Sequence, residues 1–354
     1  MTDAPDFPWE PLKLCVQRLD SDRCPRSFEP MPGGASTRCF VRVHFESGVT
    51  AVAMFFPEAT RSDELSKPVN AGERWPFLQV HDLLSAHGVA VPRILAEDCR
   101  HGLLLVEDLG DDTLARYLER TPDARCELYQ IAVRDLARAQ IELAHITASS
   151  IIGERAFDYD LLHREIEHFR DWALHAQGIQ PTLAEAALFE QAASHIARQA
   201  ASWPRAFVHR DYQSRNLMVK RQADGTLGLT WIDFQDALLG PRVYDLVALL
   251  SDSYQTFTPE FVDQLLVEFL RYRGISLGEF SQLRFEFDWM TVQRKLKDAG
   301  RFIFIDRVKG NATFLPFVKP TIAKVRLALA NLRADPILNA LEDCLASWFD
   351  SAAK

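Results

Sequence analysis

A short loop with a fixed spacing constrains this chain more than any other feature. His209, Arg210 and Asp211 lead to Asn216 in the pattern H-R-D-x-x-x-x-N, and Asp233 follows Asp211 by 22 residues (233 minus 211). In such a loop the aspartate accepts the proton of an attacking hydroxyl, and the asparagine holds a magnesium ion. The pairing therefore predicts a site of phosphoryl transfer. The alternative for each motif alone is a surface turn rich in hydrogen bonds.

The second aspartate comes directly after an apolar run that includes Leu227, Leu229 and Trp231. A hairpin strand over this run would present the carboxylate of Asp233 as a further metal ligand, and hard oxygen ligands are what magnesium requires. Phosphoryl transfer depends mainly on positioning and charge neutralisation. We therefore predict Asp211 as the catalytic base, with Asn216 and Asp233 as magnesium ligands on a nucleotide.

Composition limits the class of protein. The chain has 354 residues, of which 47% are hydrophobic and 25% charged, with a net charge of −9. This fits a two-lobed globular protein and argues against nucleic-acid binding, which rewards clustered Lys and Arg. No basic start followed by an apolar core marks a signal peptide, and no apolar run approaches the ~18 residues of a membrane helix. We expect a cytoplasmic protein whose six scattered cysteines are reduced thiols.

The order of expected elements divides the chain into two lobes of an α+β fold. Residues 1–110 predict a small mixed-sheet lobe, and residues 111–354 predict a mainly helical lobe with the catalytic loop, metal site and substrate pocket. Helical or strand periodicity supports each element. The expected strands are 39–45, 49–56, 94–95 and a hairpin reaching 103–110. The expected helices include 9–22, 74–87, 160–176, 183–200, 261–272, 283–300 and 321–332.

This order, together with several motifs, resembles the aminoglycoside phosphotransferase and choline kinase superfamily, whose members share the protein-kinase-like fold. Within it the chain is most similar to bacterial kinases of cell-wall amino sugars. The motifs that carry the resemblance lie at 34–40, 102–110, 209–218, 232–237, 240–241, 244–247 and 288–297. The resemblance implies an ATP- and magnesium-dependent kinase that phosphorylates the anomeric hydroxyl of N-acetylmuramic acid or N-acetylglucosamine in peptidoglycan recycling.

Further residues are assigned roles, some from their chemistry and some from the resemblance. Gly33 and Gly34 let the backbone approach phosphates, and Ser36 or Thr37 could donate a hydrogen bond, although an ordinary hairpin turn has the same composition. By resemblance, the segment from Glu107 to Leu109 is the hinge that reads adenine through its backbone. His209, Arg210 and Asp245 are expected to support the catalytic loop.

One expected kinase residue is missing. Protein kinases carry a strand lysine that holds the nucleotide phosphates, but the corresponding strand here offers Met54. Lys67 lies downstream in a polar loop and Arg42 lies on the preceding strand, and neither can be assigned to the role of this lysine. The phosphate clamp, including any pair between a lysine and Glu73, therefore stays open.

The sequence leaves the acceptor less defined. Candidate sugar contacts flank the metal motif or lie on the 283–300 helix, where a basic pair would suit a carboxylated sugar; each could also be a plain surface residue. The alternatives are an antibiotic, choline or other hydroxyl kinase, or a nucleotide-sensing pseudokinase. The choice of ATP over GTP and the oligomeric state stay open. The candidate contacts are Arg215, Gln235, Asp236, Arg294 and Lys297.

Overall fold

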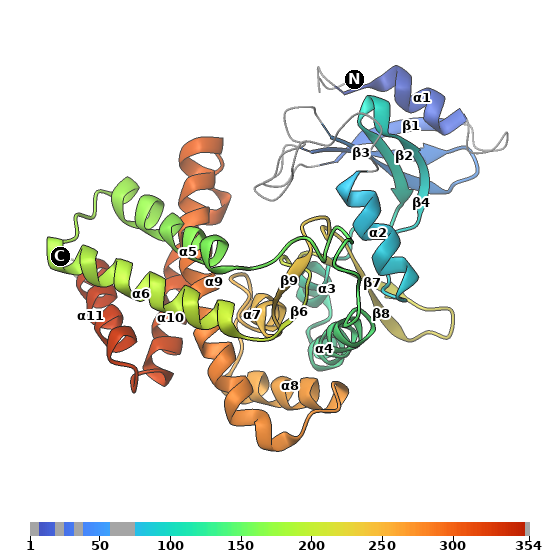
Figure 1. The fold of residues 1–354 in the computed structure, drawn as a ribbon. Coiled ribbons are helices and arrows are strands. Elements are labelled where there is room, and N and C mark those ends of the chain that lie inside the picture. The colour runs from blue at the N-terminus through green and yellow to red at the C-terminus, as the bar shows by residue number, and fades with distance from the viewer. Residues whose placement is uncertain (1–6, 18–24, 32–37, 57–74, 351–354) are drawn as a thin grey trace. The chain divides into compact units, whose positions relative to one another are not determined.

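The computed structural model describes residues 7–17, 25–31, 38–56 and 75–350 (Figure 1). Its backbone contacts divide the chain into two compact units. The first unit comprises residues 1–112 and 218–236, and the second comprises residues 113–217 and 237–354. The hairpin that precedes Asp233 therefore groups with the N-terminal unit.

A five-stranded sheet forms the centre of the first unit, in the order β1-β2-β3-β5-β4. All four pairings are antiparallel, so the sheet itself is antiparallel and not mixed. β1 was not predicted, because it begins and ends with proline; an edge strand tolerates proline, since its outer amides need no partner. The strands are β1 (Pro25–Pro30), β2 (Cys39–Phe45), β3 (Thr50–Phe55), β4 (Ile94–Asp98) and β5 (Leu103–Glu107).

One face of this sheet is covered by helix α1 (Trp9–Gln17). Alternate residues of β2, namely Val41, Val43 and Phe45, pack with Leu12 and Val16 of the helix, as the two-residue period of a strand requires. Helix α2 (Pro76–Ala86) starts with proline in its first turn and ends just before Gly88, close to the predicted 74–87.

The hairpin of β7 (Leu217–Arg221) and β8 (Leu227–Trp231) confirms the predicted strand before Asp233. Its turn contains Gly225 at a φ of 85°, which a side chain would strain. Two backbone hydrogen bonds fix the hairpin within the first unit. The amide of Trp231 donates to the carbonyl of Ala90 at 2.8 Å, and that of Val219 donates to the carbonyl of Asp112 at 2.7 Å.

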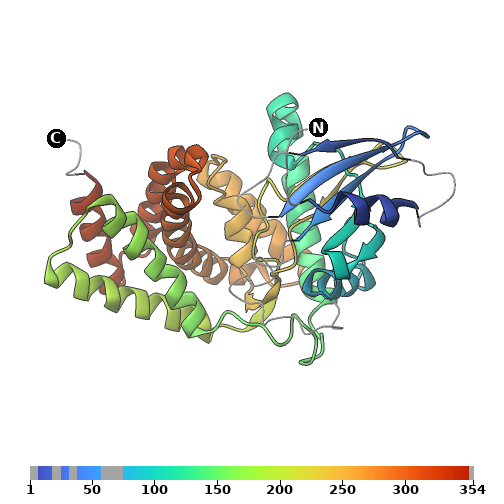
Figure 2. The same cartoon turned by 90° about the horizontal axis from the view of Figure 1, so that it is seen from above.

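The second unit is mainly helical, with one short antiparallel pair of β6 (Arg205–Val208) and β9 (Leu238–Pro241). Its long helix α9 packs against α10, and α6 packs against α11 (Figures 1 and 2). The helices are α3 (Leu114–Arg120), α4 (Arg125–Glu142), α5 (Tyr159–His168), α6 (Leu183–Ser202), α7 (Tyr244–Leu250), α8 (Pro259–Tyr272), α9 (Phe280–Lys309), α10 (Val318–Asn331) and α11 (Pro336–Asp350).

Two helix ends differ most from the sequence expectation, while the other predicted helix ends that fall on described residues lie within about three residues of it. The predicted helix 160–176 ends its α-helical part at His168 and continues as a π-helical segment over Phe169–Leu174. The predicted end of α9 at Gly300 is wrong, since the helix continues to Lys309. A Cβ atom at Gly300 would lie 2.4 Å from the carbonyl oxygen of His168, so this glycine permits close packing on the π-helical segment and does not stop the helix. Among the described helices, none has the length and apolarity to cross a bilayer.

Candidate active site

The H-R-D-x-x-x-x-N motif forms the loop between β6 and β7. Arg210 adopts a left-handed backbone with a φ of 78°, which costs a non-glycine residue about 1 to 3 kcal/mol. The side-chain nitrogen Nδ2 of Asn216 donates to the carbonyl oxygen of Asp211 at 2.8 Å, so the two ends of the motif are joined directly. The carboxylate of Asp211 is about one third exposed, at 34%.

Asp245, at the start of α7, holds the strained part of this loop. Its two carboxylate oxygens accept the backbone amides of His209, at 2.6 Å, and Arg210, at 3.0 Å. The residue is completely buried. Burial raises the pKa of Asp245 to about 7, against the opposing effect of the two amide hydrogen bonds. This carboxylate therefore fixes the backbone directly before Asp211.

Arg294 lies on the other side of the same loop and is also completely buried. One guanidinium nitrogen donates to the carbonyl oxygen of Arg210 at 2.7 Å, and another lies 3.6 Å from Oδ1 of Asp211. Its guanidinium also lies over the ring of Tyr244, 4.7 Å from the centroid. Arg294 was a candidate sugar contact, and the structure places it inside the second unit beneath the loop.

Lys297 takes part in a neighbouring buried network around Glu165. The Glu165 carboxylate accepts from the guanidinium of Arg210 at 3.1 Å and lies 4.0 Å from Nζ of Lys297. Burial alone would raise the pKa of Glu165, but Lys297 and Arg210 lower it overall, so the group is held ionised. The side chain of Lys297 is 15% exposed. Both members of the predicted basic pair thus make interactions within the second unit.

The serine of the loop is anchored by a second buried carboxylate. Asp252, which is completely buried, accepts the backbone amide of Ser214 at 3.1 Å and also its hydroxyl. The other oxygen of Asp252 accepts the amide of Tyr254 at 3.0 Å. The neighbouring Arg215 is exposed and lies over the ring of Tyr254, with its guanidinium carbon 3.5 Å from the ring centroid.

In the first unit, Asp233 follows β8 in a left-handed conformation with a φ of 63°. Its carboxylate, 34% exposed, forms an ion pair with Arg38, whose second guanidinium nitrogen donates to Oε1 of Gln235 at 3.1 Å. The amide nitrogen of Gln235 donates to both Asp233 and Asp236 at 3.1 Å. The ring of Phe234 packs on Phe77 of α2 at 4.8 Å and anchors the turn. Asp233, Gln235 and Asp236 are thus adjacent, and Arg38 joins them.

The predicted hinge is held by ion pairs within the first unit. Glu107 accepts from Lys220 at 2.8 Å and from Arg93 at 3.1 Å. Asp108 accepts from Arg42 at 2.7 Å, and although burial alone would raise its pKa, this hydrogen bond and that from Gly110 lower it overall. The side chains of these acids are therefore engaged. Leu109 makes no hydrogen bond through its backbone to any described residue.

The phosphate-loop predictions lie outside the described residues, namely Gly33, Gly34, Ser36 and Thr37. Lys67 and Glu73 also lie outside them. Met54 is buried in β3 opposite Phe40 and Leu104, and Arg42 is engaged by Asp108 and Asp111. Neither residue therefore replaces the strand lysine in the described part of the chain.

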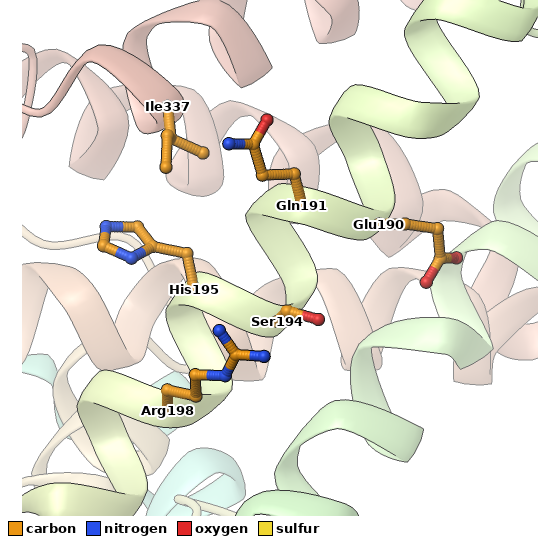
Figure 3. A pocket seen from close by; sticks show the side chains of 6 residues that line it. All are labelled: Glu190, Gln191, Ser194, His195, Arg198 and Ile337. Carbon is orange, nitrogen blue, oxygen red and sulfur yellow. The ribbon is translucent and has the colours of Figure 1, made fainter.

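A surface pocket of about 420 Å³ lies between α6 and the start of α11 in the second unit (Figure 3). It contains none of the predicted site residues. His195 is paired with Asp335 at 2.7 Å, and Glu190 accepts from Arg170 at 2.5 Å, so its charged side chains serve the packing of helices. The lining residues are Glu190, Gln191, Ser194, His195, Arg198 and Ile337.

Sequence reasoning missed four residues that contact the predicted site. Arg38 stood inside a quoted motif but received no role, and Glu165 had no signal beyond a place on an amphipathic helix. Asp252 and Tyr254 follow directly after the apolar run of α7, where a buried acid at a helix end was a usable signal.

An antiparallel-sheet unit that includes the Asp233 hairpin, and a helical unit with a braced H-R-D-x-x-x-x-N loop, define a kinase-like phosphotransferase fold. Solved structures agree: an aminoglycoside phosphotransferase bound to gentamicin has a TM-score of 0.61 over 92% of this chain and 97% of its own, at 12% identity. That identity supports the fold alone. The predicted α+β, protein-kinase-like fold is therefore confirmed.

The chain belongs to the phosphotransferase enzyme family, whose family model matches residues 27–285. A relative from Pseudomonas aeruginosa, the N-acetylmuramate/N-acetylglucosamine kinase, is 34% identical over 77% of each chain. A protein of the same name from Caulobacter vibrioides is 29% identical over 91% of each chain. The prediction of a small-molecule kinase in this superfamily is confirmed.

Proposed function

We propose that the protein is an ATP-dependent kinase that phosphorylates the anomeric hydroxyl of N-acetylmuramic acid, N-acetylglucosamine or both. The observation that carries this proposal is the 34% identity, over 77% of each chain, to a relative named as a kinase of these two sugars. The product would be a sugar 1-phosphate. A nucleotidyltransferase is the class of enzyme that could consume it, and the use of ATP suits a cytoplasmic reaction.

Asp211 would be the catalytic base in this reaction. It would accept the proton of the anomeric hydroxyl as that oxygen attacks the terminal phosphorus of ATP, while the bond from this phosphorus to the bridging oxygen breaks and ADP leaves. Two features support the role: the carboxylate is partly exposed, and the backbone directly before it is fixed by Asp245 and Arg294. A fixed backbone keeps a base within reach of the proton that it removes, which geometry requires before pKa matters.

Asn216 and Asp233 would hold magnesium. The donor set suits this ion: Asn216 uses its amide nitrogen for the carbonyl of Asp211, which leaves its side-chain oxygen for a metal, and Asp233 offers a partly exposed carboxylate. Bound magnesium would neutralise charge on the nucleotide phosphates.

The nucleotide base would be read at the hinge. The backbone amide of Leu109 has no partner among the described residues and would donate to adenine, while the ion pairs of Glu107 fix the adjoining strand end. Gly33, Gly34, Ser36 and Thr37 would contact the phosphates, as proposed from the sequence.

Coupled ADP release by the purified protein tests the proposal. The panel comprises N-acetylmuramic acid, N-acetylglucosamine, glucose, choline and kanamycin, each with magnesium and either ATP or GTP. We expect turnover on the two amino sugars with ATP, loss of turnover in Asp211→Asn, and ordinary turnover in Asp263→Asn, which changes a half-exposed carboxylate on α8.

Identification of the product separates the alternatives. A phosphate on the anomeric oxygen, shown by ³¹P and ¹³C NMR, is the expected result. Turnover only on choline or kanamycin would keep the kinase class and replace the substrate. Nucleotide binding without turnover on any acceptor would favour the pseudokinase.

A further inference from the structure

Arg215 has an unusual environment for a residue of the catalytic loop. It stands directly before Asn216, is exposed, and lies with its guanidinium carbon 3.5 Å from the ring centroid of Tyr254 and 5.6 Å from that of Phe317. Among the described residues it has neither a carboxylate partner nor a hydrogen bond. Its positive charge is therefore positioned by aromatic rings and not neutralised by the protein.

One buried carboxylate fixes both members of this pair. Asp252 accepts the amide of Ser214, next to Arg215, and the amide of Tyr254. The ammonium group of Lys324 donates to the carbonyl oxygens of Asp252 and Gln255, which holds the segment from the other side. The stacked pair is thus built on a rigid support that also fixes the catalytic loop.

Tyr254 adds a second polar group at the same place. Its hydroxyl has no hydrogen-bond partner among the described residues. Burial is the main cause that raises the pKa of Tyr254; Arg215 opposes the shift, and the carboxylates of Asp298, Asp252 and Asp211 add to it. The phenol therefore stays a neutral donor beside the guanidinium of Arg215.

The chemistry of this pair selects an anionic ligand. A guanidinium that stacks by its face keeps its edge N–H groups available, and these match the two oxygens of a carboxylate. Arg294 and Lys297, from which the sequence predicted recognition of a carboxylated sugar, are engaged within the second unit. Arg215 is the candidate sugar contact in this unit whose charge has no internal partner.

We propose that Arg215, stacked on Tyr254, binds the carboxylate of an acidic acceptor sugar and sets the preference of the enzyme for that sugar over its neutral counterpart. This inference rests on the proposed function, because it assigns the lactyl carboxylate of N-acetylmuramic acid as the ligand. N-acetylglucosamine has the same ring without the lactyl group and is the matched neutral substrate.

The test compares kcat/KM for the two sugars in Arg215→Gln, Arg215→Lys, Tyr254→Leu and Tyr254→Phe. A charged hydrogen-bonded contact predicts that Arg215→Gln lowers kcat/KM for N-acetylmuramic acid about 10- to 100-fold and changes that for N-acetylglucosamine less than about 3-fold. Arg215→Lys should lie between, since it keeps the charge without the planar fork. Tyr254→Leu removes the platform and should resemble Arg215→Gln; Tyr254→Phe keeps it and should lose less.

Arg271→Gln is the matched control, because Arg271 is exposed on α8 and pairs only with nearby Glu268 in the described structure. It should leave both substrates unchanged. The methyl ester of N-acetylmuramic acid is the ligand control, and it should respond to Arg215→Gln no more than N-acetylglucosamine does.

Retained turnover of N-acetylglucosamine shows that the Arg215 variants fold. Equal losses on both sugars, with a raised KM for ATP, would assign Arg215 to the nucleotide and overturn this inference while leaving the proposed function intact. A wild-type enzyme that phosphorylates N-acetylglucosamine but not N-acetylmuramic acid would also overturn it. Turnover of neither sugar would reject the proposed function, and the assigned carboxylate with it.

Discussion

The two aspartates of the predicted site are held in different ways. In the second unit, the loop of Asp211 is fixed by the fully buried Asp245, Asp252 and Arg294, which bind its backbone. In the first unit, the carboxylate of Asp233 is itself paired with Arg38 and Gln235. One aspartate is positioned through its main chain and keeps its carboxylate available, while the other engages its carboxylate directly.

This difference follows from the proposed roles. A base must point at one proton, and a rigid backbone provides that direction without using its oxygens. A metal ligand needs a carboxylate that is oriented toward the ion, and the contacts of Arg38 and Gln235 with Asp233 supply such an orientation. A left-handed backbone occurs at both places: Arg210, directly before Asp211, has a φ of 78°, and Asp233 itself has a φ of 63°. Strain at both places is compensated by the surrounding bonds.

The largest expected effects separate the two aspartates by their response to magnesium. Asp211→Asn should lower kcat about 10²- to 10⁴-fold, as removal of a general base does, without changing the magnesium concentration at half-maximal rate. Asp233→Asn should lower kcat/KM at least about 100-fold and raise that concentration, since a metal ligand is lost. Rates measured across a magnesium titration check both. A shift in the titration for Asp211→Asn alone would reverse the assignment.

The support of the catalytic loop can be broken at Asp245. An asparagine there has one acceptor oxygen, so its NH₂ group would face the amide of His209 or Arg210. We expect the free energy of unfolding to fall by about 1 to 3 kcal/mol, together with a lower kcat. Denaturant unfolding measures the first effect, with Asp263→Asn, which changes a half-exposed carboxylate, as the control. An unchanged kcat in a folded Asp245→Asn protein would contradict the positioning role.

Asp245 also predicts a pH dependence of stability. Burial raises its pKa from the ordinary 3.8 to about 7, so between these values the native state keeps a proton that the unfolded chain has lost. The contribution of this group to the free energy of unfolding should therefore decrease as pH rises from about 4 to 7, by up to about 1.4 kcal/mol per pH unit, and level off above pH 7. Asp245→Asn removes the contribution, so the difference between variant and wild type should depend on pH in this window. A difference independent of pH would refute the raised pKa.

The smallest expected effect concerns Arg38. Arg38→Gln removes the fork that orients Asp233 and Gln235, and outer partners of a metal ligand typically contribute about 10-fold or more to metal affinity. We expect Arg38→Gln to raise the magnesium concentration at half-maximal rate about 10-fold, with little change in the free energy of unfolding. Arg38→Lys should raise that concentration less. Arg221→Gln, at the exposed end of β7, is the control. A lower magnesium concentration at half-maximal rate in Arg38→Gln would show instead that Arg38 competes with the ion for Asp233.

The sequence determined the features that depend on local spacing. The catalytic loop, the hairpin before Asp233 and most helices follow from residues close together in the chain, because turns, caps and periodicity are local. Asp245 was also predicted as a support of the loop, but from the resemblance to the kinase superfamily and not from local spacing, which indicated only an acid at the start of a helix. The structure places its carboxylate on the amides of His209 and Arg210.

The tertiary structure alone decided which charges face inward. Arg294 reaches Arg210, 84 residues away, and Arg38 reaches Asp233, 195 residues away. Periodicity could not assign the helix side of Arg294, because residues 286–296 of α9 are buried on every face, including charged ones. A helix that is buried on all sides has no polar face that a sequence pattern could reveal, so only the packed structure shows that Arg294 supports the loop. The packed structure also shows that Arg215, in the loop itself, has no partner for its charge among the described residues.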